Sequence, residues 1–246
     1  MASNPTIEIL PTPADLFQSA AEEFVRIGNA AIAARGRFTV ALSGGSTPKS
    51  LYSLLAADYS DFAWGNTFLF FGDERHVPPI DPDSNYRMVN ESLLKKVLIP
   101  AENVFRVQAE NPDAAAVAAD YSAQIAKFFA LKRSEFPRFD LIFLGMGPDG
   151  HTASLFPGSE GLKEKSKLVI ANWVEKFKTF RISLTFPVLN RAAEVIFLTS
   201  GPDKADMVKQ VLEGDNNPPF PAQQVQPENG ELIWMLDQAA ASKLKR

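Results

Sequence analysis

The sequence of 246 residues contains no cysteine and only two histidines. Without cysteine, the chain can form no disulfide bond, thiolate metal site or cysteine nucleophile. The two histidines, His76 and His151, are also too few for a histidine-rich metal centre. Carboxylates alone can hold a metal ion, so these counts leave that one kind of metal site open.

The chain also lacks an excess of positive charge and a long apolar run. It has 25 basic and 29 acidic side chains, so no broad basic field attracts nucleic acid or an anionic membrane. Residues 1–10 include Pro5 and Glu8 where a secretory signal needs a basic start and an apolar core, and no apolar stretch reaches membrane-spanning length. We therefore expect a cytoplasmic protein that binds neither nucleic acid nor membrane.

What the sequence does contain is ordinary for a globular protein: 46% hydrophobic and 22% charged residues. We expect a single domain over residues 1–246. Short apolar segments with the composition of β-strands alternate with helical patterns, and several are apolar throughout, which indicates a mostly parallel sheet covered by helices on both faces. Ligands bind such sheets at the carboxyl ends of the strands. The predicted strands are residues 6–10, 38–42, 67–71, 140–144, 168–171, 181–185, 195–199 and 232–236.

The first unusual loop, residues 43–48 (Ser-Gly-Gly-Ser-Thr-Pro), joins a predicted strand to a predicted helix. Paired glycines let the backbone approach a ligand closely, and the start of a helix offers free amides to an anion. Gly44, Gly45 and Ser46 are therefore candidates for binding a phosphate, although an ordinary strand-to-helix turn uses the same residues. Pro48 stands where a nucleotide-binding P-loop needs glycine, so we do not expect a nucleoside triphosphate.

The second loop, residues 72–78 (Gly-Asp-Glu-Arg-His-Val-Pro), follows the most apolar predicted strand. Charged residues at the mouth of a buried strand indicate a site, because a salt network closed on itself at the surface gains little stability. Arg75 is suited to bind an anion and Asp73 a hydroxyl group. Glu74 and His76 are more typical of solvated or packed loop residues.

The third loop, residues 145–152 (Gly-Met-Gly-Pro-Asp-Gly-His-Thr), formally matches the dinucleotide fingerprint, but its proline interrupts the helix start that a dinucleotide site requires. Asp149 and His151 are two residues apart in a tight turn, so the carboxylate can orient the imidazole as a general base at neutral pH. The alternative is a histidine merely hydrogen-bonded within its loop. Arg181 and Lys204 begin a strand and a helix, from which each can reach a phosphate, although each alone resembles a surface charge.

Together, these loops closely resemble those of the 6-phosphogluconolactonase family. The resemblance extends over nearly the whole chain and includes residues 84–86 (Ser-Asn-Tyr), 144–157, 186–190 (Phe-Pro-Val-Leu-Asn) and 234–237 (Trp-Met-Leu-Asp). It implies a three-layer α/β/α fold with a Rossmann-like sheet, and hydrolysis of 6-phospho-D-glucono-1,5-lactone in the oxidative pentose phosphate pathway without a nucleotide, metal ion or other cofactor. By position, it implies these roles: His151 as the base, Asp149 as its neighbour, Arg75 as a ligand-binding cation, and Gly45, Ser46, Arg181 and Lys204 as phosphate contacts.

Two other functions remain as alternatives. Glucosamine-6-phosphate deaminases share the phosphate loop and the Asp-Gly-His turn. They differ in having the motif Asp-Glu-Tyr where this chain has Asp-Glu-Arg (residues 73–75), and a glutamate at the position of Phe156. Loss of that acid weakens a reaction that shuttles protons between carbons, whereas lactone hydrolysis needs only water activation and leaving-group protonation. A non-catalytic sugar-phosphate sensor has no need of His151 and ranks third.

Overall fold

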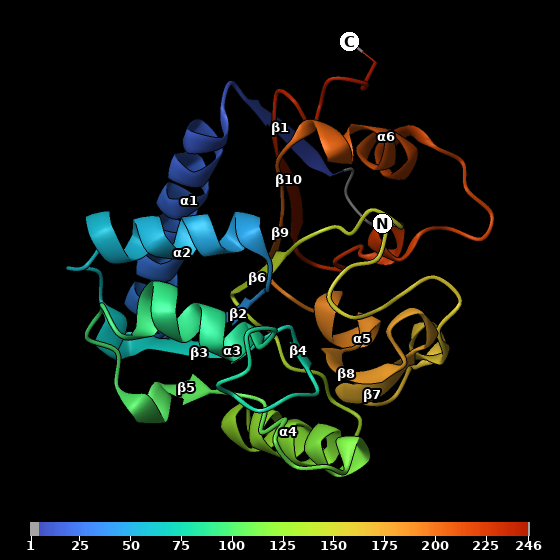
Figure 1. The fold of residues 1–246 in the computed structure, drawn as a ribbon. Helices are drawn as coiled ribbons and strands as arrows, with labels where there is room; N and C mark the ends of the chain where they lie inside the picture. Colours follow the sequence, from blue (N-terminus) through green and yellow to red (C-terminus); the bar gives the residue numbers. More distant parts are fainter. Residues whose placement is uncertain (1–4, 246) are drawn as a thin grey trace.

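The computed structural model describes residues 5–245 and has a seven-stranded sheet at its centre (Figure 1). The strand order is β1-β10-β9-β6-β2-β3-β5, and every neighbouring pair runs parallel. The parallel sheet predicted from the apolar segments is therefore confirmed. Its strands are β1 (Thr6–Leu10), β2 (Phe38–Leu42), β3 (Thr67–Phe71), β5 (Val104–Phe105), β6 (Leu141–Leu144), β9 (Glu194–Thr199) and β10 (Glu231–Asp237).

Helices flank this sheet and complete the three-layer α/β/α fold (Figure 1). The longest, α1, begins at a reciprocal cap in which the Thr12 hydroxyl accepts from the amide of Asp15 and the Asp15 carboxylate accepts from the amide of Thr12. It ends at Gly36, which is left-handed (φ 73). Among residues 5–245, no helix combines the length and apolar character that crossing a bilayer requires. The helices are α1 (Pro13–Arg35), α2 (Ser46–Asp58), α3 (Asn85–Val89), α4 (Ala114–Phe128), α5 (Phe186–Leu189) and α6 (Ala205–Glu213).

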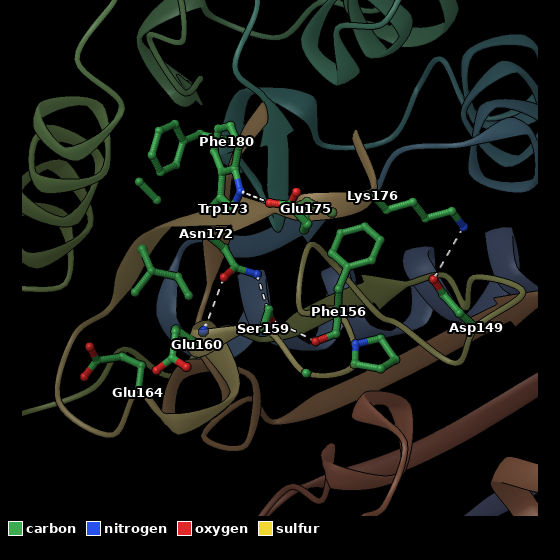
Figure 2. Close-up of a pocket in the computed structure, with 16 residues that line it drawn as sticks. Asp149, Phe156, Ser159, Glu160, Glu164, Asn172, Trp173, Glu175, Lys176 and Phe180 are labelled. Atoms are coloured by element: carbon green, nitrogen blue, oxygen red, sulfur yellow. Dashed lines mark hydrogen bonds and ion pairs between the residues drawn. The ribbon is translucent and has the colours of Figure 1, made fainter. Parts of the chain in front are cut away.

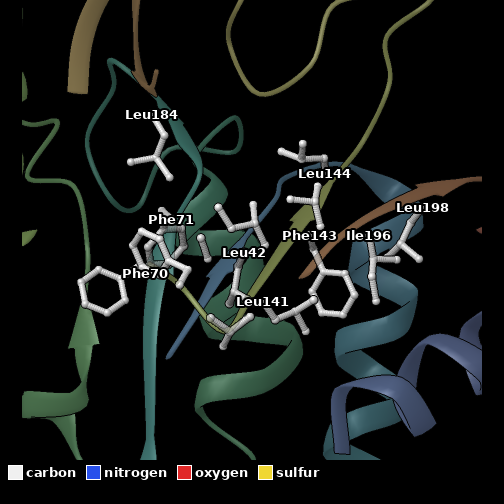
Figure 3. Close-up of a cluster of buried hydrophobic side chains, with 14 of the residues drawn as sticks. Leu42, Phe70, Phe71, Leu141, Phe143, Leu144, Leu184, Ile196 and Leu198 are labelled. Carbon is white, nitrogen blue, oxygen red and sulfur yellow. The ribbon is translucent and has the colours of Figure 1, made fainter. Parts of the chain in front are cut away.

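The core consists of side chains from the central strands and the helices that cover them. All residues of β2 and β6 are buried, as the continuous apolar pattern predicts for strands covered on both faces. Phe24 of α1 stacks parallel to Phe143 of β6 and so joins a helix to the sheet. Each such side chain contributes about 1.5–3 kcal/mol when fully buried. Figure 3 shows part of this cluster, including Leu42, Phe70, Phe71, Leu141, Phe143, Leu144, Ile196 and Leu198.

A second, three-stranded antiparallel sheet, in the order β4-β8-β7, stands beside the main one. Its strands are β4 (Asp73–Arg75), β7 (Val169–Val174) and β8 (Thr179–Leu184). The sequence located β7 and β8 but did not separate them from the main sheet, and it assigned β4 to a loop, which is wrong. The turn between β7 and β8 contains no glycine: the left-handed position is taken by Lys178 (φ 48). The turn therefore lacks the glycine that usually marks such a reversal in a sequence.

Gly72 joins the two sheets. Its amide donates to the carbonyl of Leu42 at the end of β2 (2.8 Å), and its own carbonyl accepts from the amide of Leu184 in β8 (2.9 Å). The chain therefore passes from β3 into β4 through a residue that is hydrogen-bonded to both sheets. As a result, β4 carries Asp73 and Arg75 out from the carboxyl edge of the main sheet.

Candidate active site

The three loops that the sequence singled out meet at the carboxyl edge of the main sheet, around a cavity of about 270 Å³. They follow β2, β3 and β6, and β6 and β3 both neighbour β2 in the sheet. The small sheet forms the remaining wall. The lining residues are Ser43, Gly44, Gly45, Asp73, Arg75, Asn85, Gly145, Met146, Gly147, His151, Ala153, Ser154, Phe156, Phe177 and Arg181.

His151 and Asp149 form a hydrogen-bonded pair at this cavity, with 2.5 Å between Nδ1 and Oδ1. Burial opposes the ionisation of Asp149, but the hydrogen bond and the charge of His151 outweigh it and lower the pKa of the carboxyl. The ionised carboxylate thus fixes Nδ1, and no hydrogen bond among the described residues uses Nε2. Gly147 makes room for the imidazole ring, because a Cβ at this position would lie only 2.0 Å from Nδ1 and Cε1 of His151.

At the other side of the cavity, α2 begins directly after the paired glycines. Gly45 is the N-cap residue with φ 106, and no side chain caps the helix, so its first amides have no side-chain acceptor. The Ser43 hydroxyl is buried and finds no hydrogen-bond partner within residues 5–245. These free donors give this end of the cavity the means to bind an anion.

Arg75 and Arg181 lie directly opposite one another in the β4–β8 ladder, and both line the cavity. Arg75 is held by the Asp83 carbonyl (2.9 Å) and by the Asn85 side-chain oxygen. Burial, followed by the charge of Arg75, lowers the pKa of Arg181. Like charges directly opposite in a sheet are destabilising. An anion placed between the two guanidinium groups would relieve this repulsion.

Asp73 and Glu74 are neighbours with different environments. Asp73 lines the cavity, and its carboxylate accepts from the Ser154 hydroxyl (2.6 Å). Glu74 does not line it: its carboxylate accepts from the amides of Asn85 (2.7 Å) and Tyr86 (2.8 Å) at the start of α3, and burial raises its pKa. Glu74 is thus occupied in holding α3, which agrees with its interpretation as a packed residue.

Three of the predicted site residues lie outside the cavity wall. Asp149 acts on the cavity only through His151, and Ser46 is the first residue of α2, directly behind Gly45. Lys204 follows β9, one strand beyond β6, and its ammonium lies 3.5 Å from the Asp203 carboxylate. His76, which the sequence did not place in the site, has its Nε2 2.7 Å from the Asn111 carbonyl.

The cavity also includes residues to which the sequence gave no role. Asn85 donates to the Asp73 carbonyl (2.9 Å) and packs so closely against Gly44 that a Cβ there lies 1.9 Å from its oxygen. Phe177 reaches the cavity from the β7–β8 turn, 5.4 Å from the Arg181 guanidinium. The Ser-Asn-Tyr motif was a signal for Asn85, whereas no sequence signal marked Phe177.

A larger groove of about 580 Å³ runs beside the cavity along β7 and the segment from Phe156 to Glu164 (Figure 2). Phe156 lines both hollows. At one end of the groove Lys176 approaches the Asp149 carboxylate (3.8 Å), and Glu164 lies at the other end (Figure 2). The Asp149 carboxylate, which is hydrogen-bonded to His151, therefore also faces a cation from the β7–β8 turn.

Fold and site together define a sugar-phosphate enzyme of the α/β class. Residues 11–234 match the family described as glucosamine-6-phosphate isomerases/6-phosphogluconolactonase, and the chain belongs to this family. A relative from Nostoc sp. named 6-phosphogluconolactonase is 40% identical over 240 residues, which cover 97% of this chain and 98% of the relative. The chloroplastic 6-phosphogluconolactonase 3 of Arabidopsis thaliana is 44% identical over 218 residues, covering 85% of this chain and 66% of the relative.

Solved structures agree with this assignment. The 6-phosphogluconolactonase from Trypanosoma cruzi superposes with a TM-score of 0.90 at 31% identity, covering 100% of this chain and 99% of that one. A monomeric glucosamine-6-phosphate deaminase superposes with a TM-score of 0.80 at 20% identity, covering 97% of this chain and 100% of that one. The second likeness concerns the fold alone.

Proposed function

We propose that this chain is a 6-phosphogluconolactonase that hydrolyses 6-phospho-D-glucono-1,5-lactone to 6-phospho-D-gluconate in the oxidative branch of the pentose phosphate pathway. His151 activates the water in this reaction. The single observation that carries the proposal is that one cavity of about 270 Å³ holds both the histidine of the Asp149–His151 pair and two directly opposed arginines. Such a cavity suits a small substrate with a phosphate at one end and a reactive carbonyl at the other.

The phosphate binds between the glycine-rich loop and the two arginines. The amides of Gly45 and of the first turn of α2 donate to it, and Arg75 and Arg181 supply charge. The net charge of the chain is -4, so these placed cations are needed to hold an anion. With the phosphate anchored, the lactone ring extends toward His151 on the far side of the cavity.

Nε2 of His151 removes a proton from a water molecule as the water oxygen attacks the lactone carbonyl carbon. The resulting tetrahedral intermediate carries its negative charge on the former carbonyl oxygen, for which the backbone amides of the loop that holds His151 are the candidate donors. When the bond from that carbon to the ring oxygen breaks, the imidazolium returns the proton to the ring oxygen. Asp149 holds the ring in place and stabilises its charged form throughout.

The two alternatives fit the cavity less well. The ring of Phe156 is stacked on His151 (4.1 Å between centroids), so the place where deaminases carry an acid is apolar here. A sensor has no need of a histidine held by a carboxylate at the cavity wall. The expectations of a cytoplasmic location, no nucleic-acid partner and a single domain stay predictions.

Proton release tests the proposal, because the lactone also opens unaided and an enzyme must exceed that background. Freshly prepared lactone is added to the purified protein, and a deaminase assay with glucosamine 6-phosphate is run in parallel. We expect rapid proton release from the lactone and no ammonia from the amino sugar. Robust deaminase turnover without acceleration of lactone opening would overturn the assignment, and binding without any turnover would identify a sensor.

A further inference from the structure

One face of the His151 imidazole is covered by an aromatic ring. The ring of Phe156 stacks on one face at 4.1 Å between centroids and 25° between planes. The backbone at Gly147 is against the ring as well, since a Cβ there lies 2.0 Å from Nδ1 and Cε1. With Nδ1 bound to Asp149, the ring is constrained at one edge and over its surface, and Nε2 is left without a partner among the described residues.

Phe156 reaches this position because the chain reverses between the two aromatic rings. The Leu155 amide donates to the Thr152 carbonyl (2.9 Å), and Ala153 takes a left-handed conformation (φ 46). A positive φ is unfavourable for alanine, so the surrounding contacts must hold it. The Thr152 hydroxyl donates to the Gly145 carbonyl (2.9 Å), and the Ser154 hydroxyl donates to Asp73 (2.6 Å).

The Phe156 ring itself has little freedom. The Phe156 backbone carbonyl accepts from the hydroxyl (2.8 Å) and the amide (3.1 Å) of Ser159. The Phe156 ring contacts the Phe177 ring edge-on, with 5.9 Å between centroids. Only 8% of its surface is exposed. The ring is therefore a fixed wall, on one side of which lies His151 and on the other the larger groove.

We propose that Phe156 is a positioning residue for His151, which holds the flat imidazole in the plane that directs Nε2 at the lactone carbonyl. This rests on the function proposed above for His151. Asp149 alone fixes one nitrogen but leaves the ring free to rotate about that hydrogen bond. A flat ring against its face removes this remaining freedom, and a displacement of about 1 Å from the reacting geometry can cost about 100-fold in rate.

The test replaces the ring while keeping an apolar side chain. Phe156→Leu retains most of the volume but offers no flat surface, whereas Phe156→Tyr retains the ring. We expect Phe156→Leu to lower kcat at least about tenfold with KM and the Kd for 6-phosphogluconate changed less than about threefold, and Phe156→Tyr to restore most of kcat. Phe180→Leu is the matched control, because Phe180 lines the groove without contacting His151. If Phe156→Leu does not fold, Phe156→Met replaces it.

A spectroscopic measurement reads the contact without any turnover. The chain has only two histidines, so the imidazole proton spectrum is simple, and His76→Gln assigns it. A phenyl ring stacked on the face of His151 shifts its ring protons upfield. We expect these signals to move downfield in Phe156→Leu and to stay near the parent position in Phe156→Tyr, with the His76 signals unchanged in both.

Any of these results would overturn the positioning role: an active parent whose kcat is unchanged in Phe156→Leu, a Tyr variant as impaired as the Leu variant, or His151 signals that do not move. An equal loss in Phe180→Leu would also overturn it, because the effect would then belong to the groove in general. A parent that fails to accelerate lactone opening would instead refute the proposed function. The activity of the parent thus separates the two failures.

Discussion

The two sheets contribute to the site in different ways. The main parallel sheet supplies backbone amides and His151, the proposed general base, from loops that follow fully buried strands, and its wall is rich in glycine. The small antiparallel sheet supplies charged side chains, Asp73, Arg75 and Arg181, from strands that are only partly buried. In the proposed function, the main sheet therefore supplies the general base and the amides that contact the phosphate, and the small sheet supplies the cations that hold it.

The largest effect that tests this division is expected at His151. His151→Ala should lower kcat by about 100-fold or more, as loss of a general base usually does, and leave binding of 6-phosphogluconate largely intact. Stopped-flow proton release and calorimetric titration of the product measure the two quantities. His76→Ala is the control, because His76 bonds to Asn111 away from the cavity. Near-normal turnover in His151→Ala would show that His151, and with it the loops of the main sheet, does not supply the general base.

A smaller effect, of the opposite kind, is expected in the small sheet. Arg181→Ala should weaken binding of 6-phosphogluconate by about 10- to 100-fold, the usual cost of a lost charged hydrogen bond. Turnover at saturating lactone should fall less, although anchoring of the phosphate also helps to orient the carbonyl. Calorimetric titration measures the Kd. Unchanged product affinity would show that the small sheet does not hold the phosphate.

Lys204→Ala sharpens the same comparison with a smaller expected change. Sequence reasoning ranked Lys204 with Arg181 as a phosphate contact, but Lys204 does not line the cavity and its ammonium is near Asp203. We therefore expect its loss to weaken product binding by no more than about threefold, as for a charge at a distance in water. The same titration decides: a loss equal to that of Arg181→Ala would mean that Lys204 moves to the phosphate when ligand binds.

The smallest effect, none at all, is expected from removal of metal ions. Exhaustive chelator treatment should leave lactonase activity unchanged, because Asp73 is hydrogen-bonded to Ser154, Asp149 is committed to His151 and Glu74 holds α3. No group of three or more potential metal ligands is found in the described part of the chain. Loss of activity in chelator, with recovery on adding one divalent ion, would contradict this prediction.

The sequence predicted the main sheet and site residues in both sheets, but it did not predict the small sheet that brings Asp73, Arg75 and Arg181 together. Residues 38–42 and 67–71 are apolar except for Thr39 and Thr67, so the sequence predicted burial on both faces, and the polar loops after them stood out by contrast. The opposition of Arg75 and Arg181 depends on the register of two strands that are more than 100 residues apart in sequence, to which no local pattern points. Phe177 was missed because it lies in a turn that has Lys178 at its left-handed position, and no glycine marks that turn in the sequence.

The support of the catalytic turn was likewise invisible in the sequence. Residues 216–227 are rich in proline and follow no periodic pattern. In the structure, the Ala222 amide donates to the Gly150 carbonyl (3.0 Å) and Phe220 packs against Gly150. A segment about 70 residues further along the chain thus steadies the loop of His151. Contacts of this kind follow from tertiary packing, which single-sequence patterns do not encode.

Gly72, hydrogen-bonded to β2 through its amide and to β8 through its carbonyl, has a consequence for the timing of the reaction. Because this residue is hydrogen-bonded to both walls, the structure has the cavity assembled without a bound substrate. The substrate has a limited lifetime, because it opens unaided in water. An enzyme that needs no closing motion can capture such a molecule at the first productive encounter, at a rate set by diffusion and orientation rather than by a slower conformational step.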